Sequence, residues 1–514
     1  MNNGGSGFGN RLIRNTLFNI GGQFWAVLIA FFLTPYIIRQ VGIARYGIWA
    51  MISVLTGYFG LFDLGLGQSF EKFIAEYRTS REEVKLNQVV NSGLVFYALL
   101  GLLMILVAGA AVEPLTGIFR IPSDLRAEAR YLFFWGVVAF SIGNLFRVFT
   151  VIQTGFQRMD ISNKLGVAVS LLNLAGVILV LGKGLGLRGL MLNSLVITSI
   201  TGLASMVIAF RLFPSLSLGL HALNPTSLRT LSWFGIKRWV TSIEDVITYQ
   251  TDKLLISHFL NISLVGFYQL GFTIADKAAY LVRLLTSAVV PAASELDTRG
   301  QREKIIRLQS RGLKYISLTG FPIFAFTLAT APVLVFAWLG PGYGNSVLVL
   351  RIFSLVMMMA LLGSISSAIA VGIGHPEFQM LAGGGQAILN LILSLILVLR
   401  IGFPGVVLAT LVSISLSNTY FMVKFYRFLG TSLVSALREC VWKPMAVAVC
   451  LAVPLAILNR LPRLQELSRP AALAWLALEG ALFFPLFLLL IRKTGFLAEE
   501  DRQMFKKIIS LRLS

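Results

Sequence analysis

Long apolar runs separated by short polar segments recur along the whole chain. A helix needs about 20 apolar residues to cross the roughly 30 Å hydrocarbon layer of a bilayer, and runs such as 22–38, 93–112 and 471–491 are close to that length. The pattern predicts about fourteen spans, at 17–38, 46–67, 90–112, 132–153, 165–182, 189–210, 239–260, 265–288, 315–338, 347–371, 380–400, 404–424, 441–458 and 472–491. The predicted fold class is therefore all-α, a polytopic membrane protein.

Composition and charge agree with a chain solvated by lipid. Of 514 residues, 56% are hydrophobic and only 13% are charged, and the mean hydropathy is +0.79. The net charge of +21 would suit nucleic-acid binding, but a membrane protein concentrates lysine and arginine in its cytoplasmic loops. With the amino terminus inside, roughly 28 Lys and Arg residues fall in cytoplasmic segments and roughly 11 in external ones. This bias predicts that both termini are cytoplasmic, and no nucleic-acid partner is expected.

The sequence offers no metal or cofactor motif. Cys440 and Cys450 lie ten residues apart on one predicted helix, a spacing that does not allow a disulfide. The three histidines are widely separated, and no phosphate-binding loop of the GxxxxGK[ST] type is present. We therefore expect no metal, no cofactor and no ATP hydrolysis by that route, so that an ion gradient, a substrate gradient or a partner drives the protein.

The two halves of the chain share a pattern at an offset of about 217 residues. Asn173 in Leu-Asn-Leu follows Gly155 by eighteen residues, and Asn390 in Leu-Asn-Leu follows Gly372 at the same spacing. Further matches pair Gly189 with Gly405, Ser194 with Thr410, and Tyr46-Gly47 with Val265-Gly266. Collinear matches over several spans predict an internal duplication.

Six predicted spans separate equivalent positions, and an even number returns the chain to the side where it started. The halves are therefore predicted to be parallel repeats with a path between them. We expect an N-lobe of six helices at 1–218, a C-lobe of six helices at 219–428, and two further helices with a basic cytoplasmic tail at 429–514.

Charged residues inside the seventh and eighth spans are costly in lipid. In the seventh, Glu244, Asp245, Asp252 and Lys253 each cost roughly 2.5–3.5 kcal/mol at the bilayer centre. Steps of three and four residues place Asp245 and Asp252 on one helical stripe with Arg238, Thr241 and Thr248. The eighth span repeats this pattern with Gln269, Thr273, Asp276, Tyr280, Arg283 and Ser287, with Lys277 beside them. Such stripes predict faces that are turned away from lipid.

Two interpretations of these charges are open. In the first, a hydrated cavity receives an anionic headgroup, with substrate-lumen candidates Arg147, Lys253, Lys277, Arg283, Gln269 and Tyr280, and ion-coupling candidates Asp63, Glu244, Asp245, Asp252 and Asp276. In the second, the charges neutralise one another between packed helices, for example Asp252 with Lys253 or Asp276 with Lys277.

The segment 19–76 resembles the amino-terminal signature of bacterial polysaccharide exporters. The residues that carry the resemblance are Pro35, Val41-Gly42, Tyr46-Gly47 and the run Leu61-Phe62-Asp63-Leu64-Gly65-Leu66-Gly67. In the second half, Asp252-Lys253-Leu254-Leu255-Ile256 followed by Val265-Gly266-Phe267-Tyr268 resembles the seventh-span motif of the same family. The chain is thus similar to the Wzx-type flippases of the multidrug/oligosaccharidyl-lipid/polysaccharide exporter superfamily, which have a MATE-like and MurJ-like fold.

The resemblance implies a flippase of the bacterial inner membrane. Such proteins move undecaprenyl-pyrophosphate-linked oligosaccharide across that membrane by alternating access, for O-antigen, capsule or exopolysaccharide synthesis. It also implies coupling to protons or sodium, and a place among other glycan-assembly proteins. No enzymatic activity is expected.

Three alternative functions remain, one of which is a passive scaffold in a glycan-assembly complex, whose membrane-buried charges would then lack a purpose. A cation-coupled multidrug exporter on the same scaffold would favour an apolar cavity with an isolated carboxylate. A membrane glycan polymerase or ligase would favour a large external loop, whereas the longest external segment expected here is about 113–131.

Overall fold

The computed structural model describes residues 25, 29–219, 239, 243–244, 246–286, 288–460 and 467–497. Over these residues the chain forms helices joined by short turns and contains no strand. The predicted all-α fold class is confirmed. The helices fall into two compact units, Met1–Gly266 and Phe267–Ser514, and each unit is described by itself.

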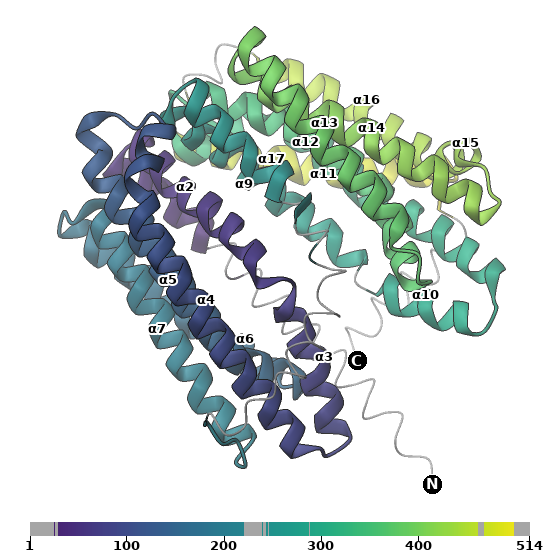
Figure 1. Ribbon diagram of the computed structural model, residues 1–514. Helices are drawn as coiled ribbons and strands as arrows, with labels where there is room; N and C mark the ends of the chain where they lie inside the picture. The colour runs from purple at the N-terminus through teal and green to yellow at the C-terminus, as the bar shows by residue number, and fades with distance from the viewer. Residues whose placement is uncertain are drawn as a thin grey trace. The chain divides into compact units, whose positions relative to one another are not determined.

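In the first unit, α4, α5 and α7 run alongside one another (Figure 1). Residues 29–41 and 246–259 of this unit are also helical. The remaining elements are α2 (Ile43–Gly60), a 3₁₀ turn η1 (Leu61–Asp63), α3 (Leu66–Thr79), α4 (Glu83–Ile118), α5 (Ser123–Gly155), α6 (Met159–Gly182) and α7 (Gly186–Leu212). Tyr97, Phe70 and Phe149 belong to the buried core between α3, α4 and α5.

In the second unit, α13 and α14 form an antiparallel pair, and α11 packs against α12, α16 and α17 (Figure 1). Phe321, Ala448 and Phe487 contribute to the buried core between α11, α16 and α17. The bounds are α9 (Ile262–Arg283, which begins in the first unit), η3 (Leu284–Thr286), α10 (Val289–Thr298), α11 (Arg302–Leu339), α12 (Gly344–Gly372), α13 (Glu377–Ile401), α14 (Phe403–Leu429), α15 (Leu433–Ala436), a π turn η4 (Leu437–Val441), α16 (Trp442–Leu458) and α17 (Arg469–Lys493).

Eleven helices of the described part are long and apolar enough to cross a membrane. They match eleven of the predicted spans, from the third to the sixth and from the eighth to the fourteenth. The count of fourteen is not confirmed. The other three predicted spans overlap the helical residues 29–41, α2 and 246–259, which fall outside the eleven.

Several helices are longer than the bilayer requires. At 1.5 Å per residue, the 36 residues of α4 and the 38 residues of α11 extend over about 54 and 57 Å, against roughly 30 Å of hydrocarbon. Both begin with charged residues at Glu83 and Arg302, so we expect these ends to project into water.

The hairpin of α6 and α7 and the hairpin of α13 and α14 have the same construction. Asn193 Nδ2 donates to Asn173 Oδ1 at 2.8 Å, and Asn390 Nδ2 donates to Thr410 Oγ1 at 3.2 Å, both across a separation of 20 residues. Asn173 and Asn390 are the asparagines of the Leu-Asn-Leu repeat. The two asparagines are equivalent in the duplicated sequence, and their partners are one position apart, because Thr410 is matched with Ser194 and not with Asn193.

Glycines of the repeat also occupy equivalent close contacts. A Cβ on Gly189 would lie 2.6 Å from Leu185 Cβ, and one on Gly405 would overlap the carbonyl oxygen of Leu397. Gly155 and Gly372 end α5 and α12, and each faces a short preceding helix at a distance that excludes a side chain, α3 in the first unit and α10 in the second. The duplication thus appears as matched helix contacts.

The compact units and the sequence repeat do not divide the chain at the same place. The residues 246–259 lie in the first unit, although the repeat assigns them to the second half. The domain bounds 1–218, 219–428 and 429–514 stay a prediction based on sequence equivalence.

Candidate substrate and coupling sites

The first candidate site begins where the second predicted span is interrupted. α2 ends at Gly60, earlier than the predicted 67, because Leu64 and Gly65 have positive φ values of 51° and 73° and cannot continue a right-handed helix. The turn places Asp63 just before the start of α3. Its Oδ2 accepts the backbone N–H of Gly67 at 3.2 Å, which satisfies a free amide of the first turn.

Asp63 is also the centre of a polar cluster with Tyr97 and Arg147, on three different helical segments. Tyr97 donates its hydroxyl hydrogen to Asp63 Oδ1 at 2.5 Å, and Arg147 Nη1 lies 3.9 Å from Asp63 Oδ2. A Cβ at Gly67 would lie 2.5 Å from Arg147 Cζ, so the guanidinium occupies space that only glycine leaves open. The Arg147 side chain is 44% exposed, against 15% for Asp63.

The structure therefore brings together two predicted residues, Asp63 and Arg147, that are far apart in the sequence. Tyr97 was missed by the sequence analysis. It is a single tyrosine in the apolar third span, and the only available signal was that its hydroxyl needs a partner when it is buried.

The second candidate site surrounds Lys253, which is 2% exposed within the first unit. Its Nζ donates to Gln250 Oε1 at 3.1 Å and to Ser53 Oγ of α2 at 3.4 Å. The fully buried Asp252 carboxylate attracts the Lys253 ammonium. The Lys253 ammonium is therefore held by two neutral oxygens and lies close to the charge of Asp252.

A second contact ties the same helical segment to α2. The hydroxyl groups of Tyr58 and Thr251 lie 2.7 Å apart. Near the other end of the segment, Ser257 Oγ donates to the carbonyl oxygen of Phe119 at 2.8 Å. The helical residues 246–259 of the seventh predicted span are therefore held against neighbouring segments by hydrogen bonds that involve Thr251 and Ser257, which lie outside the predicted stripe.

The third candidate site lies on α9. Arg283 Nη2 is 2.7 Å from Asp276 Oδ1, and Lys277 Nζ is 3.7 Å from Asp276 Oδ2. The two cations are 42% and 45% exposed, whereas the carboxylate is 28% exposed. One acidic group thus faces two cations, and a net positive charge remains on this face of the helix.

The remaining polar residues of α9 follow the predicted stripe. Gln269 Nε2 donates to Thr273 Oγ1 at 3.1 Å, and Tyr280 is half-buried. On the adjoining face of α9, the Tyr268 ring packs edge-on against Phe353 of α12 at a centroid distance of 5.5 Å. α9 is therefore amphipathic, with its apolar face covered by α12.

The other predicted positions are only partly described. Glu244 is half-buried, and Asp245 lies outside the described residues, as do Arg238, Thr241 and Ser287. The described residues contain no group of three or more His, Cys, Asp or Glu side chains that could hold a metal ion.

A separate pocket of about 270 Å³ lies between α2, α5 and α7. Its polar lining includes Thr56, Asn144 and Ser194, and its apolar lining includes Trp49 and Phe140. Thr56 of α2 and Asn144 of α5, polar residues on two apolar helices, therefore share one pocket within the first unit.

The sequence matches one protein-family model and resembles several known proteins. The family model described as polysaccharide biosynthesis protein matches residues 12–297, which is more than half of the chain. A probable flippase, AglR, of Haloferax volcanii is 23% identical over 79% of this chain and 82% of its own length. A putative O-antigen transporter of Shigella flexneri is 21% identical over 77% of this chain and 93% of its own.

Solved structures share the fold. The lipid II flippase MurJ in an inward closed conformation has a TM-score of 0.71 and 13% identity, covering 93% of this chain and 99% of its own. An inward-facing multidrug resistance MATE transporter of the MOP superfamily has a TM-score of 0.66 and 17% identity, covering 83% and 96%. At these identities the likeness concerns the fold.

Proposed function

Because the chain belongs to the polysaccharide biosynthesis protein family, we propose that it is a flippase that moves a lipid-linked oligosaccharide across a membrane. The observation that carries the proposal is the pairing of carboxylates with half-exposed cations on membrane helices, at Asp63–Arg147 and at Asp276–Arg283. A guanidinium that is only partly neutralised is suited to a phosphate, to which it donates two parallel hydrogen bonds.

The proposed substrate is an oligosaccharide carried on undecaprenyl pyrophosphate. In this proposal Arg147, Lys253, Lys277 and Arg283 attract the pyrophosphate, and Gln269 and Tyr280 bond to sugar hydroxyls. The two lobes move so that the site opens first to one side of the membrane and then to the other, while the polyprenyl chain stays in lipid. The relatives named flippase and O-antigen transporter support this substrate class.

We propose that transport is coupled to a gradient of protons or sodium. The acidic residues that would bind the ion are Asp63, Glu244, Asp245, Asp252 and Asp276. A substrate phosphate that attracts Arg147 leaves Asp63 without its cation, and proton or sodium binding then compensates the carboxylate. Substrate binding and ion binding would thus be linked through one arginine. The proposed location is the bacterial inner membrane, with both termini cytoplasmic, beside other glycan-assembly proteins.

A second candidate is a cation-coupled multidrug exporter, because a MATE transporter shares the fold over 83% of the chain. The small pocket between α2, α5 and α7, with Trp49 and Phe140 in its lining, favours this candidate. The basic residues of α9 favour the flippase, since organic cations would be repelled by Lys277 and Arg283.

The test is complementation of a flippase-null strain, scored by surface glycan at matched protein levels. Wild type is expected to restore glycan in at least one glycan background, and Arg283→Ala is expected to restore less than a tenth of that amount. Arg299→Ala is the control, because Arg299 forms an exposed ion pair with Glu295 outside the candidate sites. Drug resistance without glycan rescue in any background would favour the exporter and contradict the flippase.

A further inference from the structure

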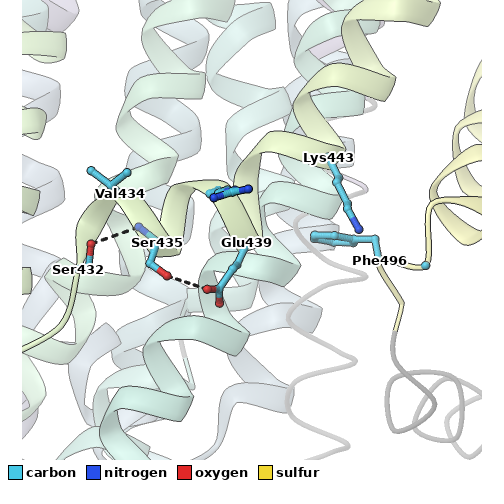
Figure 2. Close-up of a pocket in the computed structure, with 8 residues that line it drawn as sticks. Ser432, Val434, Ser435, Glu439, Lys443 and Phe496 are labelled. Carbon is cyan, nitrogen blue, oxygen red and sulfur yellow. Dashed lines mark hydrogen bonds between the residues drawn. The ribbon is translucent and has the colours of Figure 1, made fainter.

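A basic pocket lies at one end of the two carboxyl-terminal spans, apart from the candidate sites described above. Its volume is about 660 Å³, and it opens between the start of the span 433–458 and the residues that follow α17 (Figure 2). The lining residues are Ser432, Val434, Ser435, Arg438, Glu439, Lys443, Gly495 and Phe496. Since both spans end here, the pocket lies at the level where a bilayer meets water.

The backbone explains why these side chains converge. Ser432 caps α15 by accepting the backbone N–H of Ser435 at 3.3 Å. The chain then makes the π turn η4, in which hydrogen bonds join residues five apart. Arg438 and Lys443 are five residues apart and both line the pocket, whereas an α-helix would point such residues to different sides. The π turn therefore gathers two cations on one face.

The charge of the pocket is positive. Arg438 and Lys443 are exposed, and Glu439 is the single acidic group of the lining, its Oε1 accepting the Ser435 hydroxyl at 2.6 Å. Figure 2 shows Lys443 extending toward Phe496. Beyond the lining, the Lys314 ammonium lies 5.1 Å from the ring centroid of Phe496 and adds another positive charge.

Lys443 also connects the two spans. Its Nζ donates to the carbonyl oxygen of Thr494 at 3.0 Å, beyond the end of α17. An ammonium has three N–H groups, so this bond leaves two for a ligand. An anion in the pocket would therefore bind beside the hydrogen bond that links the start of α16 to the residue after α17.

The surroundings of the pocket are apolar and exposed. Val434, in the lining, is 76% exposed, and Trp442, next to Lys443 in the sequence, is 60% exposed. Val449, Val453 and Ile457 continue an exposed apolar stripe along α16 from Trp442. Tryptophan at this level is typical of the membrane interface, and the stripe below it suits an acyl chain. A soluble anion would bind the cations but would not contact the apolar stripe.

We propose that this pocket binds the phosphate headgroup of an anionic phospholipid, whose acyl chains lie along the exposed face of α16. The proposal needs only that the chain spans a membrane, and it is independent of the flippase function. A basic pocket next to transmembrane helices is a physical basis for selecting anionic over zwitterionic headgroups.

The test measures lipid retention by the purified full-length chain in detergent, using native mass spectrometry. Phosphatidylglycerol is expected to be retained in preference to phosphatidylcholine. Arg438→Gln/Lys443→Gln is expected to weaken phosphatidylglycerol binding roughly thirtyfold, since each surface cation contributes about 1 kcal/mol. Arg400→Gln/Arg460→Gln is the matched control, because these exposed arginines lie at the far ends of α13 and α16, and wild-type retention is expected.

Two further measurements decide between a lipid and a free anion. Glu439→Gln is expected to strengthen phosphatidylglycerol binding, because it removes the acidic group and keeps an acceptor for Ser435. Inorganic phosphate at equal concentration is expected not to displace the lipid. Unchanged lipid binding by the double variant would overturn the proposal, as would displacement by inorganic phosphate alone or equal retention of phosphatidylcholine.

Discussion

A carboxyl group inside a membrane protein needs hydrogen-bonding or charged partners in place of water, and Asp63 has three of them. The Gly67 amide, the Tyr97 hydroxyl and the Arg147 guanidinium converge on its two oxygens. The amide and the hydroxyl are fixed by helix packing, whereas Arg147 is the partner that is half-exposed. Arg147 is therefore the member of the cluster that a substrate anion can reach.

Removing the Tyr97 hydroxyl tests whether the cluster stabilises the fold. Tyr97→Phe keeps the buried ring and removes one hydrogen bond to a charged group, so we expect a loss of about 1.5–3 kcal/mol in the free energy of unfolding. The measurement is thermal unfolding in detergent, where the midpoint should fall. Tyr420→Phe, on an exposed tyrosine, is the control and should leave the midpoint unchanged. Equal midpoints for Tyr97→Phe and wild type would mean that the bond contributes nothing.

Replacing Arg147 by lysine separates charge from geometry. Arg147→Lys keeps the positive charge but loses the planar fork that binds a phosphate through two bonds. We expect at least a tenfold loss of surface glycan in complementation, with normal protein levels. Arg130→Lys, in the exposed pair with Glu113, should transport normally. A fully active Arg147→Lys would show that only the charge at this position matters.

The sequence identified part of this site for a physical reason. Charges such as Asp63 and Arg147 are rare in apolar runs, so each stands out alone. Their proximity could not be predicted, because 84 positions separate them (147 − 63) and periodicity describes only one helix at a time. Tyr97 could not be distinguished from a core aromatic, since its hydroxyl partner lies on another segment.

At the scale of helices, apolar periodicity located most elements but not their internal breaks. The pattern predicts that the second span reaches residue 67, because Leu64, Gly65, Leu66 and Gly67 are all apolar or neutral. In the structure the left-handed φ at Leu64 and Gly65 ends the helix earlier. The π turn at Leu437–Val441 was likewise hidden, because one extra residue per turn leaves composition unchanged. Both irregular turns position charged side chains.

The repeat glycines provide a test of helix contact. Gly405→Ala would bring Cβ against the carbonyl oxygen of Leu397 in the neighbouring helix, and backbone cannot move away easily. We expect it to cost about 1–3 kcal/mol. Gly385→Ala, on an open face of α13, should be neutral or stabilise by up to about 1 kcal/mol, because alanine is the better helix former. Thermal unfolding of the two variants measures the difference, and equal midpoints would contradict the packing argument.

For the whole molecule, the distribution of charge predicts the orientation in the membrane, which helix packing does not determine. Lysine and arginine gather in the segments that alternate topology places on one side, among them 299–314 and 492–512. Both termini lie on the same side only if the number of spans between them is even. The helices 29–41, α2 and 246–259, which fall outside the eleven, therefore matter to orientation as much as to fold.

Reporter fusions test that orientation directly. A fluorescent protein fused at the carboxyl terminus should fluoresce, and alkaline phosphatase fused there should be inactive, because the first matures in the cytoplasm and the second outside it. Phosphatase inserted between α6 and α7, at Lys183, should be active, since an odd number of predicted spans precedes it. Adding three lysines at that turn opposes the positive-inside bias and should lower its export. An active phosphatase at the carboxyl terminus would require an odd number of spans or a reversed chain, and the signal at Lys183 separates these: it is lost if the chain is reversed and kept if a later span is missing.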